Sequence, residues 1–210
     1  MLTGSKKDLL EMQKWSKKNS PIAYLVLSMN GKWDCKNPNA ENVIASFVKY
    51  WPDARAELVR QGRKSIANLD IPTQNGKPWQ ALHLNFVQLM LDMPQFLDQA
   101  DEYELLESFS RDMRAMISWE EPQVEDTFTG AVIYALDKQE RFDEAFEMFE
   151  ALKKPVANSI VIVYGRSLLD RCDTKRAEAV LEPYRGKSTD ERILGQLTVL
   201  DNLKRLRGEV

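Results

Sequence analysis

The stretch from Tyr134 to Leu152, YALDKQERFDEAFEMFEAL, decides how this 210-residue chain is expected to fold. It contains the end of one apolar-periodic segment, a tight polar turn, and an amphipathic segment that begins near Phe142. This pattern predicts two antiparallel helices joined by a short connection. A hairpin of this size cannot bury its apolar face alone, so we expect it to stack on neighbouring helices.

A second predicted hairpin has similar parts. Ala145 lies near the start of the second helix of the first hairpin, and Ala177 has the same place 32 residues later. A small side chain there lets the helix pack closely on the one before it. An apolar residue four positions on, Phe149 or Leu181, reaches the same interface.

These features resemble the tetratricopeptide repeat, and FDEAFEMFEAL is also similar to the pentatricopeptide repeat. The resemblance covers about residues 124–186 and includes Gly165, which precedes Ala177 by the spacing of the family's small residue. It implies a right-handed stack of hairpins. The chain departs from the family at Ile133, which stands where a small residue is usual, and in its period of 32 rather than 34 or 35. An antiparallel bundle with alanines at the helix crossings is the alternative.

The rest of the chain also favours helices, because apolar residues recur three and four apart and strand patterns are nearly absent. We expect an all-α fold with an irregular helical bundle in the N-terminal part. Pro52 is expected to break or kink a helix, and Pro94 is expected to start a new segment. A β-hairpin around 22–31 is the local alternative. Helices are predicted near 6–18, 21–29, 39–51, 53–62, 79–93, 101–119, 123–137, 142–153, 157–171, 174–184 and 189–206.

The segment Pro72 to Pro78, PTQNGKP, is dense in turn residues and is the candidate linker. It suggests an N-terminal helical region, residues 1–77, and a helical-repeat region, residues 78–210, although one continuous domain is also compatible with the pattern. The last helix is expected to cap the stack through its isoleucine and leucines: Ile193, Leu194, Leu197, Leu200, Leu203 and Leu206.

Composition limits the location of the protein and its partners. The longest apolar run, residues 22–27, has six residues, whereas a membrane-spanning helix needs roughly 20. No signal-peptide pattern is present at the N-terminus, so a cytoplasmic protein without membrane contact is expected.

The net charge of -3 is unevenly distributed. Residues 92–126 contain eleven acids and two arginines, which suggests either a surface for a basic partner or a solvated helix face.

Residues for catalysis are hard to find in the sequence. His83 is the only histidine, and it lies in an apolar segment, where a hydrogen-bonded core or boundary residue is expected. Cys35 and Cys172 form no metal or redox pattern. Glycine-rich phosphate loops are absent. The sequence therefore predicts no catalytic residue, no metal site and no cofactor, and an enzyme without a recognisable motif is kept as an alternative function.

Single-stranded RNA is a second alternative, because pentatricopeptide proteins bind it. The sequence pI of about 5.4 and the charge balance of zero over residues 127–210 disfavour it. The basic candidates lie outside the repeats: Lys6, Lys7, Lys14, Lys17 and Lys18, or Arg55, Arg60, Arg63 and Lys64.

Protein recognition is the function that the resemblance implies. In tetratricopeptide-like stacks the first helices of successive hairpins line a concave surface. Carried over from Ala145 and Ala177, the family geometry implies that Tyr134, Lys138, Arg166 and Asp170 face it. A tyrosine with two cations suits an acidic or aromatic segment of a partner. We therefore expect a non-enzymatic protein-protein interaction module that acts as an adaptor, a scaffold or a chaperone-like protein.

Overall fold

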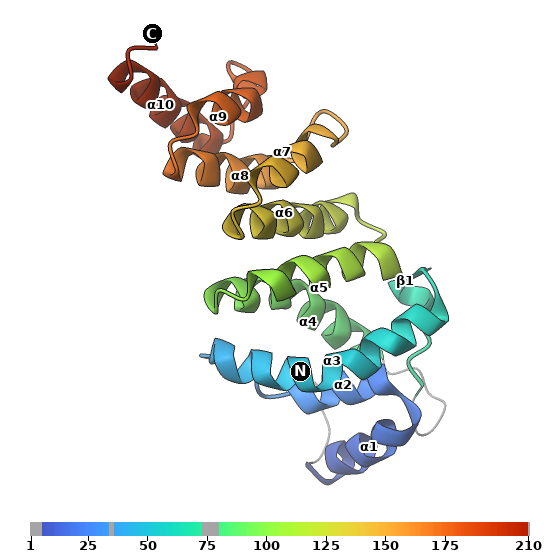
Figure 1. Ribbon diagram of the computed structural model, residues 1–210. Helices are drawn as coiled ribbons and strands as arrows, with labels where there is room; N and C mark the ends of the chain where they lie inside the picture. Colours follow the sequence, from blue (N-terminus) through green and yellow to red (C-terminus); the bar gives the residue numbers. More distant parts are fainter. Residues whose placement is uncertain (1–5, 34–35, 73–79, 210) are drawn as a thin grey trace. The chain divides into compact units, whose positions relative to one another are not determined.

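The computed structural model describes residues 6–33, 36–72 and 80–209 of a mostly α-helical chain (Figure 1). Contacts divide the chain into two compact units, Met1–Glu120 and Glu121–Val210, and each is described by itself. The predicted boundary between residues 77 and 78 lies outside the described residues, as do Cys35 and Trp79. The prediction of a helical fold is confirmed.

The first unit contains five described α-helices, one 3-10 helix and two very short strands. Their bounds are α1 Lys6–Asn19, α2 Pro21–Met29, α3 Ala40–Gln61, β1 Lys64–Ser65, η1 Ile66–Asn68, α4 Gln80–Gln99, α5 Tyr103–Met116 and β2 Ile117–Ser118.

Local sequence explains several of these bounds. Ser20 caps α2, because its side chain accepts a hydrogen bond from the amide of Ala23, and Pro21 takes the first helical position, which needs no backbone donor. Gly31 follows the helix at a φ of 78°, which only glycine adopts readily. Residues 22–29 are therefore helical, and the alternative of a β-hairpin there is wrong.

Neither internal proline divides a helix, so the break considered at Pro52 and the new segment predicted from Pro94 are both wrong. α3 continues through Pro52, and α4 continues through Pro94. Pro52 is exposed and Val48, four residues earlier, is 48% exposed, so the carbonyl freed by the proline lies on the solvent side of the helix. Buried apolar residues follow each proline, among them Ala54 and Leu97, and their packing favours continuation of the helix.

A parallel pair of two-residue strands was not predicted. β1 pairs with β2 in the register Lys64 to Ile117 and Ser65 to Ser118. β2 replaces the last residues of the helix expected to reach Trp119. The two strands join the segment after α3 to the segment after α5, although more than 50 residues separate them in the sequence.

The core of the first unit lies between α2, α3, α4 and α5. α2 packs against α1, α3 and α4, and α4 packs against α3 and α5. Three aromatic rings meet at its centre: the Phe47 ring stacks on Trp51 with centroids 5.2 Å apart, and both meet Phe109 edge to face. The apolar residues predicted for α4 are buried, namely Leu82, Phe86, Leu89 and Met93.

The second unit contains five α-helices and one 3-10 helix within the described residues. Their bounds are α6 Pro122–Lys138, α7 Phe142–Glu150, α8 Asn158–Asp170, α9 Thr174–Leu181, η2 Glu182–Tyr184 and α10 Glu191–Leu206. Asp173 and Asp190 cap α9 and α10, since each side chain accepts a hydrogen bond from a backbone amide in the first turn.

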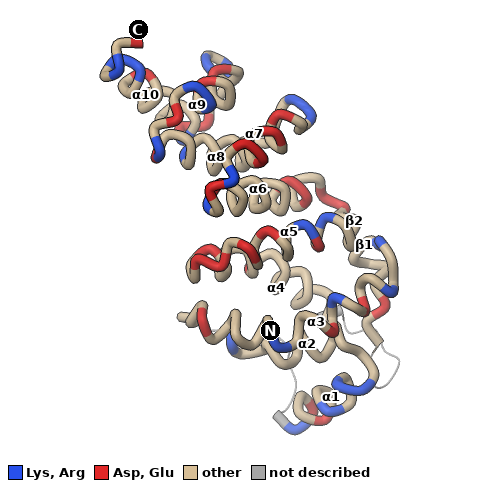
Figure 2. The backbone as a smooth tube through the Cα atoms, in the orientation of Figure 1, with Lys and Arg blue, Asp and Glu red and all other residues tan. Residues whose placement is uncertain are grey.

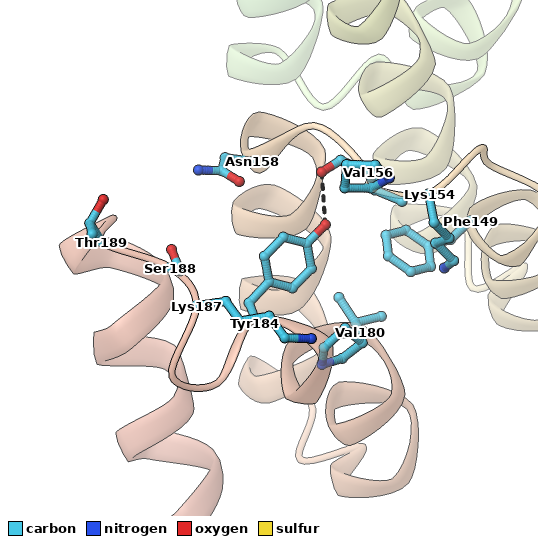
Figure 3. A pocket seen from close by; sticks show the side chains of 11 residues that line it. Phe149, Lys154, Val156, Asn158, Val180, Tyr184, Lys187, Ser188 and Thr189 are labelled. Atoms are coloured by element: carbon cyan, nitrogen blue, oxygen red, sulfur yellow. Dashed lines mark hydrogen bonds between the residues drawn. The ribbon is translucent and has the colours of Figure 1, made fainter.

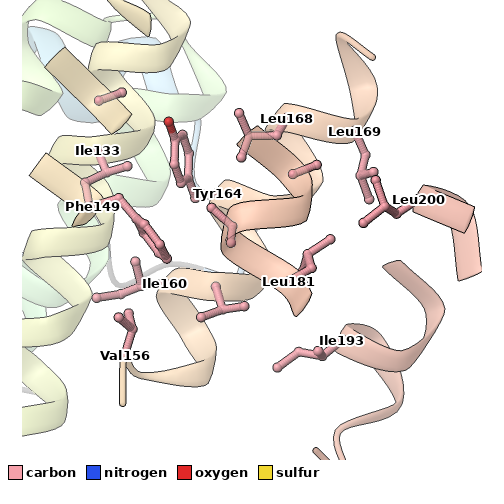
Figure 4. Close-up of a cluster of buried hydrophobic side chains, with 14 of the residues drawn as sticks. Ile133, Phe149, Val156, Ile160, Tyr164, Leu168, Leu169, Leu181, Ile193 and Leu200 are labelled. Carbon is pink, nitrogen blue, oxygen red and sulfur yellow. The ribbon is translucent and has the colours of Figure 1, made fainter. Parts of the chain in front are cut away.

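Alternate helices of this unit pack directly on one another. α6 packs against α7 and α8, and α8 packs against α9 and α10. One apolar cluster joins the five helices, as Figure 4 shows for residues from Ile133 on α6 to Leu200 on α10. The predicted crossing residues Ala145, Phe149, Ala177 and Leu181 are all in it.

Glycines permit two close helix contacts in this cluster. A Cβ added at Gly165 on α8 would lie 2.9 Å from Leu181 Cδ2 on α9 and 2.7 Å from Gln196 Oε1 on α10. At Gly130 on α6, the same atom would lie 3.3 Å from Ile160 Cγ1 on α8. The space left by the missing side chain at Gly165 is thus filled by the side chains of α9 and α10.

The final helix α10 buries only part of its predicted stripe. Ile193, Leu197 and Leu200 are buried, but Leu194 is 41% exposed and Leu206 is 85% exposed. Leu194 follows Ile193 by one residue, and one residue turns a helix by about 100°, which points it away from α8 and α9. The expectation that Leu194 and Leu206 bury in the core is therefore wrong.

Candidate functional site

The four residues predicted to contact a partner lie on α6 and α8 of the second unit. Lys138, Arg166 and Asp170 are exposed, and Tyr134 is half-buried. α6 packs against α8, so the two pairs of residues lie on neighbouring helices. Val163, one turn before Arg166, is 43% exposed and adds an apolar side chain to the same face of α8. We call this set of five residues the α6/α8 face.

Charges on the α6/α8 face are paired within each helix. The Lys138 ammonium lies 5.2 Å from the centroid of the Tyr134 ring, at a spacing of four residues. Arg166 Nε lies 3.0 Å from an Asp170 carboxylate oxygen, also four residues away. Both partners of that ion pair are mostly exposed, so the pair contributes little to stability. A bound segment could exchange these contacts at small cost.

A buried carboxylate joins the two hairpins of the second unit. Asp137 on α6 is 5% exposed and accepts hydrogen bonds from the Ser167 hydroxyl on α8 and from Arg171 in the turn that follows α8. The Arg171 guanidinium also lies 4.1 Å from the centroid of the Phe142 ring. Burial lowers the pKa of Arg171, and the neighbouring Asp173 opposes this effect.

The junction continues to the second helices of both hairpins. Arg176 on α9 pairs with Asp143 on α7 and, at 3.3 Å, with Asp173. Tyr164 lies near these charges in the core, and burial raises the pKa of its hydroxyl. This polar network crosses from one hairpin to the next. Because hydrogen bonds and ion pairs depend on the orientation of their groups, the network specifies how the hairpins pack, which apolar contacts alone do less strictly.

The sequence did contain one signal for this junction. Asp137 follows the buried Ile133 by four residues, so helical spacing places it on the apolar face of α6. A single acid on an apolar face is expected to have a partner. Its partners Ser167 and Arg171 are 30 and 34 residues away, and no local pattern identifies them.

A pocket of about 720 Å³ opens in the second unit at the ends of its helices. It lies between the segment that connects α7 to α8 and the segment that connects α9 to α10. Tyr184 ties the two segments together, because its hydroxyl donates a hydrogen bond of 2.7 Å to the carbonyl of Val156 (Figure 3). The lining residues are Phe149, Lys154, Pro155, Val156, Asn158, Val180, Pro183, Tyr184, Lys187, Ser188 and Thr189.

The other residues considered for chemistry do not converge. His83 is half-buried and its Nε2 lies 3.2 Å from the Leu69 carbonyl, as expected for a hydrogen-bonded boundary residue. Cys172 is a half-buried free thiol in the other unit. Within residues 6–33, 36–72 and 80–209, no group of three metal-ligating side chains is found. In the same ranges, no helix is long and apolar enough to cross a membrane.

The acidic residues of the 92–126 segment and the basic candidates for RNA binding lie mainly in the first unit. Figure 2 shows acidic positions gathered around the turn from α4 to α5. Two of the basic candidates are held in ion pairs: Arg55 binds Asp112 through two hydrogen bonds, and Arg60 binds Glu57. The Arg55 contact joins α3 to an acidic residue of the 92–126 segment, and both lie within one unit. RNA binding by these residues stays a prediction.

Comparisons of the chain with models of protein families, with curated proteins and with solved structures find no match. The functional argument therefore depends on the geometry described above.

Proposed function

We propose that the unit Glu121–Val210 is a tetratricopeptide-like module that binds a segment of another protein on the α6/α8 face. The direct packing of alternate helices supports this proposal most strongly. α8 packs against α6 on one side and α10 on the other, in addition to its hairpin partner α9. In helical repeats this packing of first helices produces a continuous recognition surface, whose outward residues are not needed for the core.

The composition of the α6/α8 face suggests the chemistry of the partner. Tyr134 and Val163 offer partly exposed apolar surface, while Lys138 and Arg166 offer cations beside it. Aromatic and arginine side chains contribute strongly at protein interfaces. An acidic segment with an aromatic or aliphatic residue would pair with the cations and cover the apolar side chains. The module would then act as an adaptor, a scaffold or a chaperone-like protein rather than an enzyme.

The test is affinity capture with the full chain, followed by quantitative binding of the protein that is captured. The variant Tyr134→Ala, Lys138→Glu, Arg166→Glu removes the ring and reverses both cations. We expect at least a roughly tenfold loss of affinity, because truncation of central contacts costs 1 kcal/mol or more each. Thermal unfolding should change by only a few degrees, since surface substitutions away from special contacts have small effects.

Lys153→Glu with Lys175→Glu is the matched control. Both lysines are exposed in the same unit, outside the α6/α8 face, and the double change alters the net charge by the same amount. Equal loss of binding in the control and the test variant would contradict the proposal. Salt-sensitive retention of single-stranded RNA, with no captured protein, would favour the alternative function instead.

A further inference from the structure

We propose that the pocket between the α7–α8 and α9–α10 connections binds a free organic acid with an apolar or aromatic body. This site is separate from the α6/α8 face, so the inference does not rest on the proposed function. Its lining residues come from Phe149 to Thr189 and belong to one compact unit.

The size and floor of the pocket fit a small molecule. Ligand sites in proteins have volumes of roughly 300–1,000 Å³ and are mostly apolar, with a few polar groups that orient the ligand. Here the volume is about 720 Å³, and Phe149, Val156 and Val180 belong to the buried cluster of the unit. Burial of an apolar body against these side chains would provide the main favourable free energy.

The charged residues that line the pocket favour the binding of an anion. Two of its lining residues, Lys154 and Lys187, are cationic, and none of the eleven is acidic. Lys154 Nζ is 3.7 Å from Glu150 and 4.7 Å from the centroid of the Phe149 ring. Among the described residues, Lys187 has no ion-pair partner within 4.0 Å. A carboxylate in the pocket would supply that partner.

Neutral polar groups complete the arrangement. In the view of Figure 3, Asn158, Ser188 and Thr189 lie on one side of the Tyr184 ring, and Phe149 and Lys154 lie on the other. Asn158 is also the first residue of α8, whose N-cap Ala157 has no capping side chain. The partial positive charge of that helix end adds to the charge of the lysines. The pocket therefore combines an apolar floor with hydrogen-bond donors and cations.

Tyr184 links the two connections that border the pocket. Its hydroxyl donates to the Val156 carbonyl across the pocket wall, and it is protonated at neutral pH, since a tyrosine titrates near pH 10 and burial raises the pKa of Tyr184 further. The bond joins the two connections that carry the lysines. Pre-organised walls of this kind reduce the conformational entropy that the protein must lose when a ligand binds.

The experiment compares three probes of nearly equal shape: 2-naphthoate, 2-naphthalenemethanol and 2-naphthylmethylamine. Calorimetry with the full chain, at probe concentrations up to about 1 mM, should detect binding of the acid and at least roughly tenfold weaker binding of the alcohol and the amine. Amide NMR shifts should be largest at Asn158 and at Ser188 and Thr189. Equal binding of acid and alcohol, or no binding of the acid, would overturn the proposal.

Variants separate the cations of the pocket from general surface charge. Lys187→Gln should weaken 2-naphthoate binding by at least roughly tenfold, and Lys154→Gln should weaken it by a smaller factor. Lys153→Gln is the matched control, because Lys153 is the exposed neighbour of Lys154 but does not line the pocket. Equal weakening by the control, or binding of a peptide carboxyl terminus with no binding of the free acid, would overturn the assignment.

Discussion

Arg171, in the turn after α8, donates a hydrogen bond to the buried carboxylate of Asp137 on α6. The pair lies where one hairpin of the second unit meets the next. The pair forms only when the opposite charges meet in the correct orientation, a condition that apolar side chains alone would not impose on the packing of the hairpins.

The first prediction concerns the loss of this carboxylate. Asp137→Asn should lower the free energy of unfolding by about 3 kcal/mol, because it leaves the partly buried Arg171 without its closest anion. Denaturant unfolding followed by circular dichroism measures the change. Asp170→Asn is the control, and since Asp170 is exposed in a surface pair, it should cost less than about 1 kcal/mol.

A double substitution tests whether the two residues act as a pair. Asp137→Asn with Arg171→Met should cost clearly less than the sum of the single changes, because neither charge is then left buried alone. Additive costs would show that Arg171 stabilises the fold through its contact with the Phe142 ring and not through Asp137.

The second prediction compares two glycines inside helices. Gly165→Ala should lower the free energy of unfolding by about 1 kcal/mol, because crowding of the added Cβ, under 3.0 Å from the side chains of Leu181 and Gln196, costs about 1–3 kcal/mol and outweighs a gain in helix propensity of up to about 1 kcal/mol. Gly130→Ala is its counterpart, where the nearest atom is at 3.3 Å and the gain in helix propensity of up to about 1 kcal/mol offsets the crowding. Equal effects of both changes would contradict the close contact at Gly165.

The third prediction tests the crossing of α6 and α7. Ala145 is fully buried, so Ala145→Leu should overpack the hairpin and cost about 1–3 kcal/mol. Ala151, the exposed C-cap residue just after α7, offers a control at which the same substitution should change stability by less than about 0.5 kcal/mol. If Ala145→Leu had no effect on denaturant unfolding, the close hairpin contact would not be present in solution.

The fourth prediction concerns pH. The Tyr103 hydroxyl donates a hydrogen bond of 2.7 Å to Asp101, and this bond raises its pKa from 10.0 to about 12. The protonated form is favoured in the folded state, so the contribution to stability is complete below pH 10 and is lost as pH rises through about 12. Ultraviolet titration of tyrosinate, compared between the native chain and Tyr103→Phe, measures the shift.

Removing the acceptor provides the control for that titration. Asp101→Asn should return the pKa of Tyr103 toward its ordinary value, because the negative charge next to the phenolate is gone. An unchanged titration curve would show that partial burial, rather than the hydrogen bond, causes the shift.

Local sequence determined the helices of this protein. Ser20 and Asn39 accept hydrogen bonds from amides in the first turns of α2 and α3, and helical spacing of apolar residues in α4 and α7 predicted which side chains are buried. These signals are local, since a cap and its amide lie two or three residues apart. The same signals mislead at Pro52, because the propensity to break a helix is weaker than the packing of the residues that follow.

Only the tertiary structure decided which residues meet. Lys154 and Lys187 reach one pocket across 33 positions of sequence, and Arg171 reaches Asp137 across 34. Neither contact has a local pattern, because the ion pair depends on how α8 packs on α6 and the pocket depends on how the α7–α8 and α9–α10 connections come together. The sequence alone therefore determined the helices and most of their buried faces. The packing of hairpin on hairpin determined the buried ion pair and the pocket, since contacts between distant residues form only once the helices are in place.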